Sequence, residues 1–369
     1  MKKLKKIPFI LSLLSLLTFF TPTNADIKVV ASIKPIHSLA SYLMDGVAKP
    51  DLIVDGYASP HGFAMKPSHA KMLQNADLIF WVGEDLENFL EKPLKSIAKK
   101  AEKIELMEIK GLQVLKFRER NIFDDHEDHG HDDHDDHGKK EDDHDDHDHD
   151  DHGKKEDDHD DHDHDDHGKK EDDHDDHGHD DHGKKDGHDD HDDHDGHEGH
   201  HHGEFDPHIW LDPVNAKVIL KEMAEHLIEN DSKNEATYKS NLKKALNDID
   251  KLTADVKAEL NKSVASIVFH DAYQYFEERF NVNILGAFTV NTDVMPGAEQ
   301  LKEIREIIEH DKVACVFSEP QFNPDIIKAV AKDMNIKTGV VDPLGATLNP
   351  GKSLYFDLIR NMSASFKGC

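Results

Sequence analysis

Three histidines stand at positions where their side chains could converge on a metal ion. His61 lies in "DGYASPHGF", just after a strand-like run, His208 lies in "DPHIWLDP", and His270 closes the strand-like run "SIVFH". Loops at strand ends are where ligands converge, and three neutral imidazoles suit Zn²⁺. Taken singly, each is also typical of an ordinary loop histidine, because spacing alone does not bring the three together.

The other histidines divide into two groups. His37, His69, His226 and His310 lie in or near helix-like segments and are interpreted as structural, with an accessory role at the expected cleft kept open for His37. The rest lie in a tract at 124–203, which holds 24 of the 31 histidines together with 38 acidic residues and 8 lysines. The chain outside the tract therefore carries 77 − 38 = 39 acids against 45 − 8 = 37 bases and is close to neutral. The acidic excess belongs to the tract and disfavours nucleic acid as a partner.

The tract repeats a 15-residue unit, "HGKKEDDHDDHDHDD", letter for letter from His137 to Asp151 and from His152 to Asp166. Histidine, aspartate, lysine and glycine cannot form a packed core, so we expect a disordered segment that binds several metal ions weakly. An acidic solubilising segment would explain the aspartates but not the histidines. The string "HEGHH" at 197–201 matches a zinc-protease pattern, but the surrounding glycines argue against the helix which that mechanism needs. The accessory metal ligands predicted in the tract are His126, His129, His134, His137, His144, His147, His159, His162, His174 and His177.

Alternating strand-like and helix-like segments predict the scaffold that must position these side chains. Before the tract, strand-like runs recur at 26–33, 50–57, 77–83 and 103–109, with helix-like segments between them. This alternation predicts a parallel sheet covered by helices. Residues 26–123 and 204–231 are predicted to form this N-terminal lobe, whose last helix begins after Asp212-Pro213 as N-cap and first helical residue.

A long helix is predicted to connect this lobe with a second one. Residues 232–261 contain no proline or glycine and keep apolar residues at three- and four-residue spacing, which predicts a rigid spine helix. The alternation then resumes, so 262–369 is predicted to be a C-terminal lobe. The expected fold class is α/β, with two βα lobes and parallel sheets joined by the spine helix. Ligands bind such open sheets at the carboxyl ends of the strands, here in the cleft between the lobes.

The N-terminal residues indicate export. Four lysines precede an apolar run, and the small residue Ala25 ends a polar stretch, so residues 1–25 are predicted to be a secretory signal peptide. The apolar run is too short for a comfortable membrane span, and no other stretch of the sequence is suited to one. In an oxidising compartment, the two cysteines, Cys315 and Cys369, favour a disulfide over two unpaired thiols.

Six segments in order carry a resemblance to a known family: "DGYASPHGFAMKPS", "HIWLDP", "FHDAYQYFE", "TVNTDVMPGAEQL", "CVFSEPQFNP" and "VDPLG". Together they resemble the periplasmic zinc-binding proteins of ABC transporters, the ZnuA family, over nearly all of the exported chain. The resemblance implies that His61, His208 and His270 are the metal ligands and that Cys315 pairs with Cys369. It further implies a monomeric periplasmic receptor that carries Zn²⁺ as its cargo to an inner-membrane ABC permease, with no catalytic step.

The remaining ligands are less defined by the sequence. Some family members place a glutamate directly before the first histidine, where this chain has Pro60, which cannot coordinate. We expect the fourth position to be taken by Asp342 or by water; the alternative role for Asp342 is to cap its own turn. Glu319 and Gln321, in "SEPQF", are predicted to orient a ligand imidazole.

Two other functions remain open at this point. One is a receptor of the same kind for manganese or nickel; an imidazole at His270, where related manganese receptors have a carboxylate, favours Zn²⁺. The other is a secreted zinc hydrolase, because three histidines and an open position also describe catalytic zinc.

Overall fold

The computed structural model describes residues 26–118, 120–122, 203–260, 264–292 and 294–369. The predicted signal peptide at 1–25 lies outside these residues. So do residues 124–202 of the predicted disordered tract, including all ten of its predicted accessory histidines.

The first lobe is a four-stranded parallel sheet with the strand order β2-β1-β3-β4. Its strands are β1 (Val29–Ile33), β2 (Asp51–Val54), β3 (Leu78–Trp81) and β4 (Glu102–Glu105). The connecting helices are α1 (Lys34–Leu43), α2 (Pro67–Asn75) and α3 (Glu84–Ser96). β1 and β3 are buried at every residue, as expected for central strands of a parallel sheet that is covered on both faces.

The second lobe is also a four-stranded parallel sheet, with the order β6-β5-β7-β8. It contains β5 (Ser266–His270), β6 (Ile284–Thr289), β7 (Cys315–Ser318) and β8 (Lys337–Val340), connected through α6 (Gln274–Phe280), α7 (Ala298–His310) and α8 (Asp325–Met334). The prediction of an α/β fold with two parallel sheets is therefore confirmed. His270 is the last residue of β5, so it stands at the carboxyl edge of this sheet.

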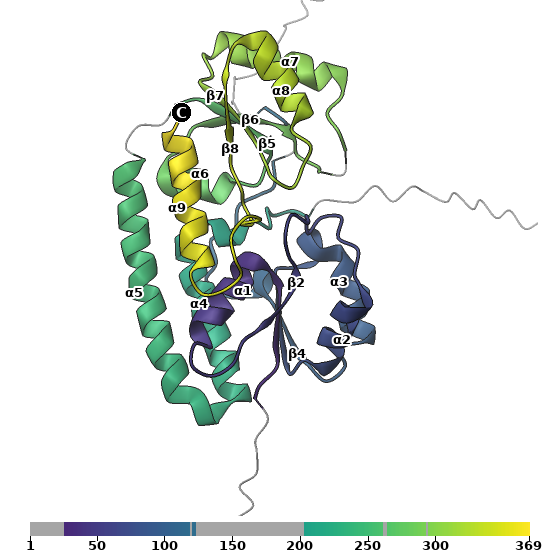
Figure 1. The fold of residues 1–369 in the computed structure, drawn as a ribbon, viewed down its shortest axis with the longest axis vertical. Helices are drawn as coiled ribbons and strands as arrows, with labels where there is room; N and C mark the ends of the chain where they lie inside the picture. Colours follow the sequence, from purple (N-terminus) through teal and green to yellow (C-terminus); the bar gives the residue numbers. More distant parts are fainter. Residues whose placement is uncertain (1–25, 119, 123–202, 261–263, 293) are drawn as a thin grey trace, which may run out of the picture. The chain divides into compact units, whose positions relative to one another are not determined.

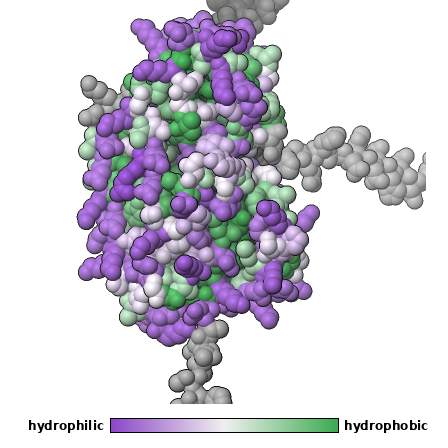
Figure 2. All heavy atoms as spheres, viewed as in Figure 1, coloured by the Kyte–Doolittle hydropathy of each residue, from purple (hydrophilic) through white to green (hydrophobic). Residues whose placement is uncertain are grey.

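The predicted spine helix is α5 (Glu235–Glu259), preceded by one 3₁₀ turn at Ser232–Asn234. It lies beside α4 (Pro213–Asn230), α1 and α9 (Leu354–Lys367). Figure 1 shows α5 and α9 running side by side along the two sheets, and Figure 2 shows mostly hydrophilic residues over the outer face of α5. Its buried residues recur at helical spacing: Tyr238, Asn241, Ala245, Ile249, Leu252 and Val256.

Helix α9 was not predicted from the sequence. After β8, the chain returns along residues 341–353 to the first lobe, and α9 packs there against α1 and α5. The returning segment is held by Lys34, whose buried ammonium donates to the carbonyl oxygens of Gly345, Ala346 and Leu348 at 3.2, 2.9 and 3.0 Å. The two sheets are thus connected by packed helices on one side and by a fixed return segment on the other.

The stem of the histidine-rich tract is also anchored to the second sheet. Lys116 and Phe205 form an antiparallel bridge, which closes the stem, and Ile122 forms another with Gly286 of β6. The amide of Ala287 donates to the carbonyl of Asn121 at 2.8 Å. Among the residues described, no helix is long and apolar enough to cross a membrane.

The disulfide between Cys315 and Cys369 confirms the predicted pairing and ties the C-terminus to β7.

We expect a free-thiol assay on the denatured, unreduced mature protein to find no reactive thiol, and two after reduction. In the chain-entropy model, a loop of 54 residues contributes about 4 kcal/mol to the free energy of unfolding. Two reactive thiols before reduction would contradict this pairing.

Candidate metal centre

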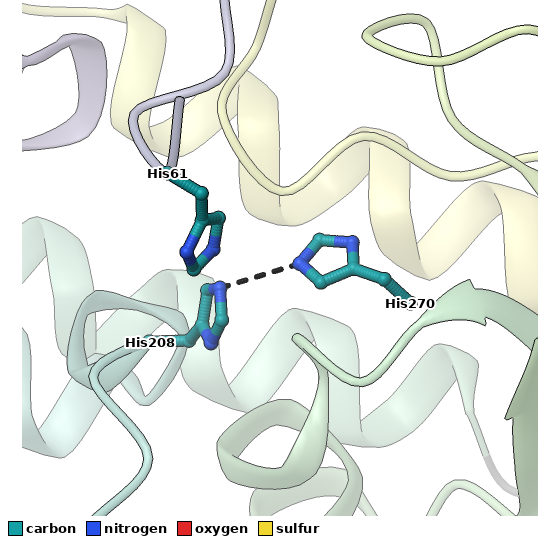
Figure 3. Close-up of side chains that lie close together, drawn as sticks. All are labelled: His61, His208 and His270. Carbon is teal, nitrogen blue, oxygen red and sulfur yellow. Dashed lines mark hydrogen bonds between the residues drawn. The ribbon is translucent and has the colours of Figure 1, made fainter. Parts of the chain in front are cut away.

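Three imidazoles converge where the carboxyl edges of the two sheets face each other. Figure 3 shows His61, His208 and His270 pointing toward one another from three separate segments. Their potential ligand atoms all lie within 4.8 Å of one another, and the ring centroids are 5.3–5.8 Å apart. His61 lies in the loop after β2, His208 precedes the 3₁₀ turn Ile209–Leu211, and His270 ends β5. The three histidines, whose positions in the sequence do not by themselves show that they meet, therefore do converge in the structure.

His208 is held by a carboxylate that the sequence analysis did not single out. Asp206 Oδ1 lies 2.7 Å from His208 Nδ1 and accepts the His208 amide at 2.9 Å. Both side chains are buried. This contact at Nδ1 fixes the orientation of the ring. The other nitrogen, Nε2, is then directed at the point where the three imidazoles converge. The sequence signal for this contact is the two-residue spacing in "DPH". An aspartate side chain can accept a hydrogen bond from the backbone amide two residues later in the chain.

Burial shifts the proton affinities of this pair. Desolvation holds the pKa of His208 well below its usual value, and the nearby His270 lowers it further. Burial also raises the pKa of Asp206 to about 7, against the opposing effects of the His208 amide and Arg118. His208 is therefore neutral at physiological pH, which is the form that can bind a metal ion.

His270 is held by Glu319, as the sequence predicted. Its Nδ1 lies 2.7 Å from Oε1 and 2.9 Å from Oε2 of Glu319, which is 3% exposed and follows β7. Burial alone would lower the pKa of His270, but the charge and hydrogen bond of Glu319 outweigh it, and the pKa is raised. The imidazole is thus both oriented and made more basic by its carboxylate partner.

The two buried imidazoles also contact each other. His270 Nε2 and His208 Nε2 are 3.4 Å apart, within hydrogen-bonding distance. A cation between the rings takes the lone pairs of both nitrogens and so competes with protons for them. Because the pKa of His270 is raised, metal binding weakens as pH falls.

The walls around the histidines leave little room. Trp210 packs on His208 with ring centroids 5.3 Å apart, and Phe322 packs on His270 at 5.7 Å. Trp210 Nε1 donates to the carbonyl of Pro343 at 2.8 Å, which fixes the return segment over the site. The space between the rings has a volume of about 10 Å³, which is enough for one water-sized particle and so for a single ion.

Asp342 and Gln321 lie beside the histidines but contact each other. Asp342 Oδ1 accepts Gln321 Nε2 at 2.8 Å and the amides of Leu344 and Gly345 at 3.0 and 2.9 Å, while Oδ2 accepts the amide of Ala346 at 2.6 Å. Asp342 thus caps its own turn, the alternative role considered above. The group of converging ligand atoms in the described part of the chain contains the three histidines and not Asp342. Gln321 contacts Asp342 rather than a ligand imidazole.

A buried ionic network supports the centre from behind. Arg118, in the stem of the tract, donates to Asp271 Oδ1 at 3.1 Å and to Glu277 Oε2 at 2.7 Å. Asp271 directly follows His270. Arg118 therefore connects the stem of the tract to the strand end that carries His270, and it partly compensates the buried carboxylates there.

Comparison with known proteins places this fold and site in a family. The model of the family described as "Zinc-uptake complex component A periplasmic" (ZnuA) matches residues 29–369. The chain belongs to this family. A relative from Brucella abortus, named "High-affinity zinc uptake system protein ZnuA", is 42% identical over 343 residues, covering 92% of this chain and 91% of the relative. The protein of the same name from Haemophilus influenzae is 36% identical over 375 residues, covering 100% and 99%.

Solved structures share the fold at lower identity. A crystal structure of ZnuA superposes with a TM-score of 0.63 at 18% identity, covering 92% of this chain and 99% of that one. A Mn-bound periplasmic metal-binding protein from Candidatus Liberibacter asiaticus gives a TM-score of 0.63 at 16% identity, covering 93% and 99%. A zinc-bound deletion mutant of ZnuA also superposes with a TM-score of 0.63 at 18% identity, so the fold occurs with zinc and with manganese and does not by itself select the ion.

The contact between His270 and Glu319 generates a testable prediction. Glu319→Gln keeps the size of the side chain but removes the charge that makes His270 a better ligand. We expect zinc affinity to fall by about 10- to 100-fold, the range found when outer carboxylates are lost from zinc sites. Competition titration with a chromophoric chelator measures this change. Glu309→Gln, at an exposed position near the end of α7, is the matched control and should leave affinity unchanged. Equal affinities for both variants would contradict the role of Glu319.

Proposed function

We propose that this protein is a periplasmic receptor that binds Zn²⁺ through His61, His208 and His270 and delivers it to an inner-membrane zinc ABC permease. Zn²⁺ is its cargo, and no bond is made or broken in a substrate. We propose that residues 1–25 direct export and that the mature receptor acts as a monomer. Membership in the ZnuA family and the names of its relatives support this function.

One observation carries the proposal: three imidazoles meet around a space large enough for one ion, and two of them are held by buried carboxylates. Zinc in proteins binds imidazole nitrogen at about 2.0–2.1 Å and prefers four ligands in a tetrahedron. Three protein ligands leave the fourth position open. Because the carboxylate of Asp342 already accepts four donors, we propose that water takes this position.

The buried carboxylates also favour a dication over a proton. A zinc ion on Nε2 of His208 and His270 adds positive charge close to Asp206, whose pKa burial raises to about 7, and this charge favours the ionised form of Asp206. Burying these carboxylates costs free energy because they lose their hydration. A bound dication offsets part of this cost by balancing their negative charge. The same contacts fix the ring orientations before the ion arrives, so little side-chain entropy is lost on binding.

The ligand types separate zinc from the other candidate metals. Manganese prefers carboxylate, carbonyl and water oxygen, whereas imidazole suits zinc, copper and nickel. Three imidazoles without a converging carboxylate thus disfavour Mn²⁺. Nickel favours square-planar or tetragonal nitrogen and oxygen sites, which three rings converging from three separate segments do not resemble.

The alternative of a secreted zinc hydrolase has less support. A general base must reach the metal-bound water, but the two nearest buried carboxylates, Asp206 and Glu319, already contact ligand imidazoles. The space between the three rings has a volume of about 10 Å³, so an ester, peptide or phosphate substrate would have to reach the ion from outside it. Measurable turnover of any such substrate by the zinc-loaded protein would favour this alternative.

The three-histidine site can be tested by substitution. We expect His61→Ala, His208→Ala and His270→Ala each to weaken the tightest zinc binding by at least about tenfold, because each removes a nitrogen ligand from a site with only three. Competition titration of the mature protein measures the change, and His310→Ala, at a histidine whose side chain is 81% exposed, is the control. Unchanged affinity in His208→Ala would show that the site is assigned incorrectly.

A second test separates the cleft from the histidine-rich tract. We propose that the tract gathers and buffers zinc while the cleft holds the ion for transport. Deleting 124–203 should therefore lower the number of zinc ions bound but leave the tightest dissociation constant within about threefold, or about 0.7 kcal/mol. Loop binding should fade between about pH 7.5 and about pH 5.5, because unperturbed imidazole titrates near 6.5. Calorimetry on both forms at the two pH values measures this, and loss of the tightest site on deletion would contradict the division of labour.

A further inference from the structure

A second group of potential metal ligands lies far from the cleft, at the other end of the first lobe. It consists of Glu102, the first residue of β4, and His226 and Glu229 near the end of α4; their ligand atoms all lie within 4.8 Å of one another. His226 lies 13 residues past Pro213, where α4 begins, which places it roughly 20 Å along the helix at 1.5 Å per residue. Glu102 stands at the amino end of its strand, whereas the cleft lies at the carboxyl ends.

The distances fit a shared ion. His226 Nδ1 lies 2.9 Å from Glu102 Oε1 and 3.9 Å from Glu229 Oε2. Two ligands that each lie about 2.0–2.2 Å from one zinc ion are at most about 4.4 Å apart. Both separations are within that limit. The Glu102 side chain is also held in place, because its other oxygen, Oε2, accepts Asn230 Nδ2 at 2.6 Å.

The opposite side of the imidazole repeats an arrangement seen in the cleft. His226 Nε2 lies 3.3 Å from Glu222 Oε1, one helical turn before it. A carboxylate on one ring nitrogen fixes the tautomer and directs the lone pair of the other nitrogen at the metal, as Asp206 and Glu319 do for the cleft histidines. A cation held between Nδ1 and the two carboxylate oxygens selects the tautomer in which Nε2 donates to Glu222 and the Nδ1 lone pair points at the ion.

The negative charge around His226 also favours a bound cation. Three carboxylates, those of Glu102, Glu222 and Glu229, surround one imidazole. Within the described part of the chain, no lysine or arginine lies within 4.0 Å of any of the three. Elsewhere on the helices, partly exposed glutamates such as Glu91 and Glu235 have as their partner a lysine four residues further along the chain. A proton or a divalent cation at Nδ1 would balance the group.

We propose that His226, Glu102 and Glu229 form a second, weaker Zn²⁺ site, with Glu222 orienting the imidazole. A donor set of one nitrogen and two carboxylate oxygens suits a borderline dication. Its ligands are more exposed than those of the cleft, with 20% of the His226 side chain and 71% of the Glu229 side chain accessible, so solvent competes for the ion. The site would add one zinc ion that remains after the histidine-rich tract is deleted.

The full mature chain allows a direct test, because trypsin releases residues 222–233 as a peptide with His226 as its single histidine. Diethyl pyrocarbonate modifies accessible neutral imidazole, and mass spectrometry of this peptide measures the rate at His226. We expect the rate to fall as free zinc, set by a nitrilotriacetate buffer, is raised. The tryptic peptide 306–312 contains only His310, whose Nδ1 lies 2.9 Å from the single carboxylate of Asp311, and it serves as the internal control.

Two matched variants separate a bound ion from an indirect effect. Glu229→Gln should raise the free zinc concentration that gives half protection of His226 by at least about tenfold, the lower end of what loss even of an outer partner costs a zinc site. Glu225→Gln, at an exposed carboxylate on the same helix and in the same peptide, should leave that concentration unchanged. His208→Ala should also leave it unchanged, so the result does not depend on the cleft. Absence of protection, equal protection of His226 and His310, or equal behaviour of the two glutamine variants would overturn the proposal.

Discussion

The structure depends on two buried contacts between an imidazole and a carboxylate, Asp206 with His208 and Glu319 with His270. A buried carboxylate or imidazole is costly unless it is paired, and each pair satisfies both partners while leaving one nitrogen for an ion. The pairs must also come from opposite sides of the site, because one belongs to the segment that leads into α4 and the other to the second sheet. Much of the remaining architecture serves to hold those two sides at a fixed separation.

Several independent connections provide that fixed separation. Helices α5 and α9 pack beside each other along the two sheets (Figure 1), and the return segment is bound to Lys34 and Trp210 of the first lobe. Arg118 joins the stem of the histidine-rich tract to Asp271, next to the third ligand. Because the ligands come from segments held in several ways, their geometry is set before an ion binds, and the binding free energy is not spent on ordering the chain. A disordered run of histidines offers the same chemistry without this advantage.

Local sequence patterns predicted the elements and singled out the three histidines, because both depend on short-range features. Strand-like and helix-like periodicity revealed the two sheets and α5. His61 and His270 follow or end a strand-like run, whereas His208 lies where the chain returns from the tract. Patterns of this kind could not reveal which polar group faces which. Asp342 was favoured as a ligand from its place at a strand end, yet its carboxylate accepts three amides of its own turn. Likewise, Glu102 and His226 are 124 residues apart, and only the packing of α4 on the first lobe brings them together.

The most direct test of the central claim is the coordination of the first zinc ion. X-ray absorption at the zinc edge, on the mature protein loaded with one equivalent of Zn²⁺, counts the imidazole ligands through their multiple-scattering signal. The three-histidine site predicts three imidazoles and one oxygen ligand at distances typical of four-coordinate zinc, about 2.0–2.1 Å. A spectrum with one imidazole and mainly oxygen ligands would place the tightest ion elsewhere in the chain and contradict the account.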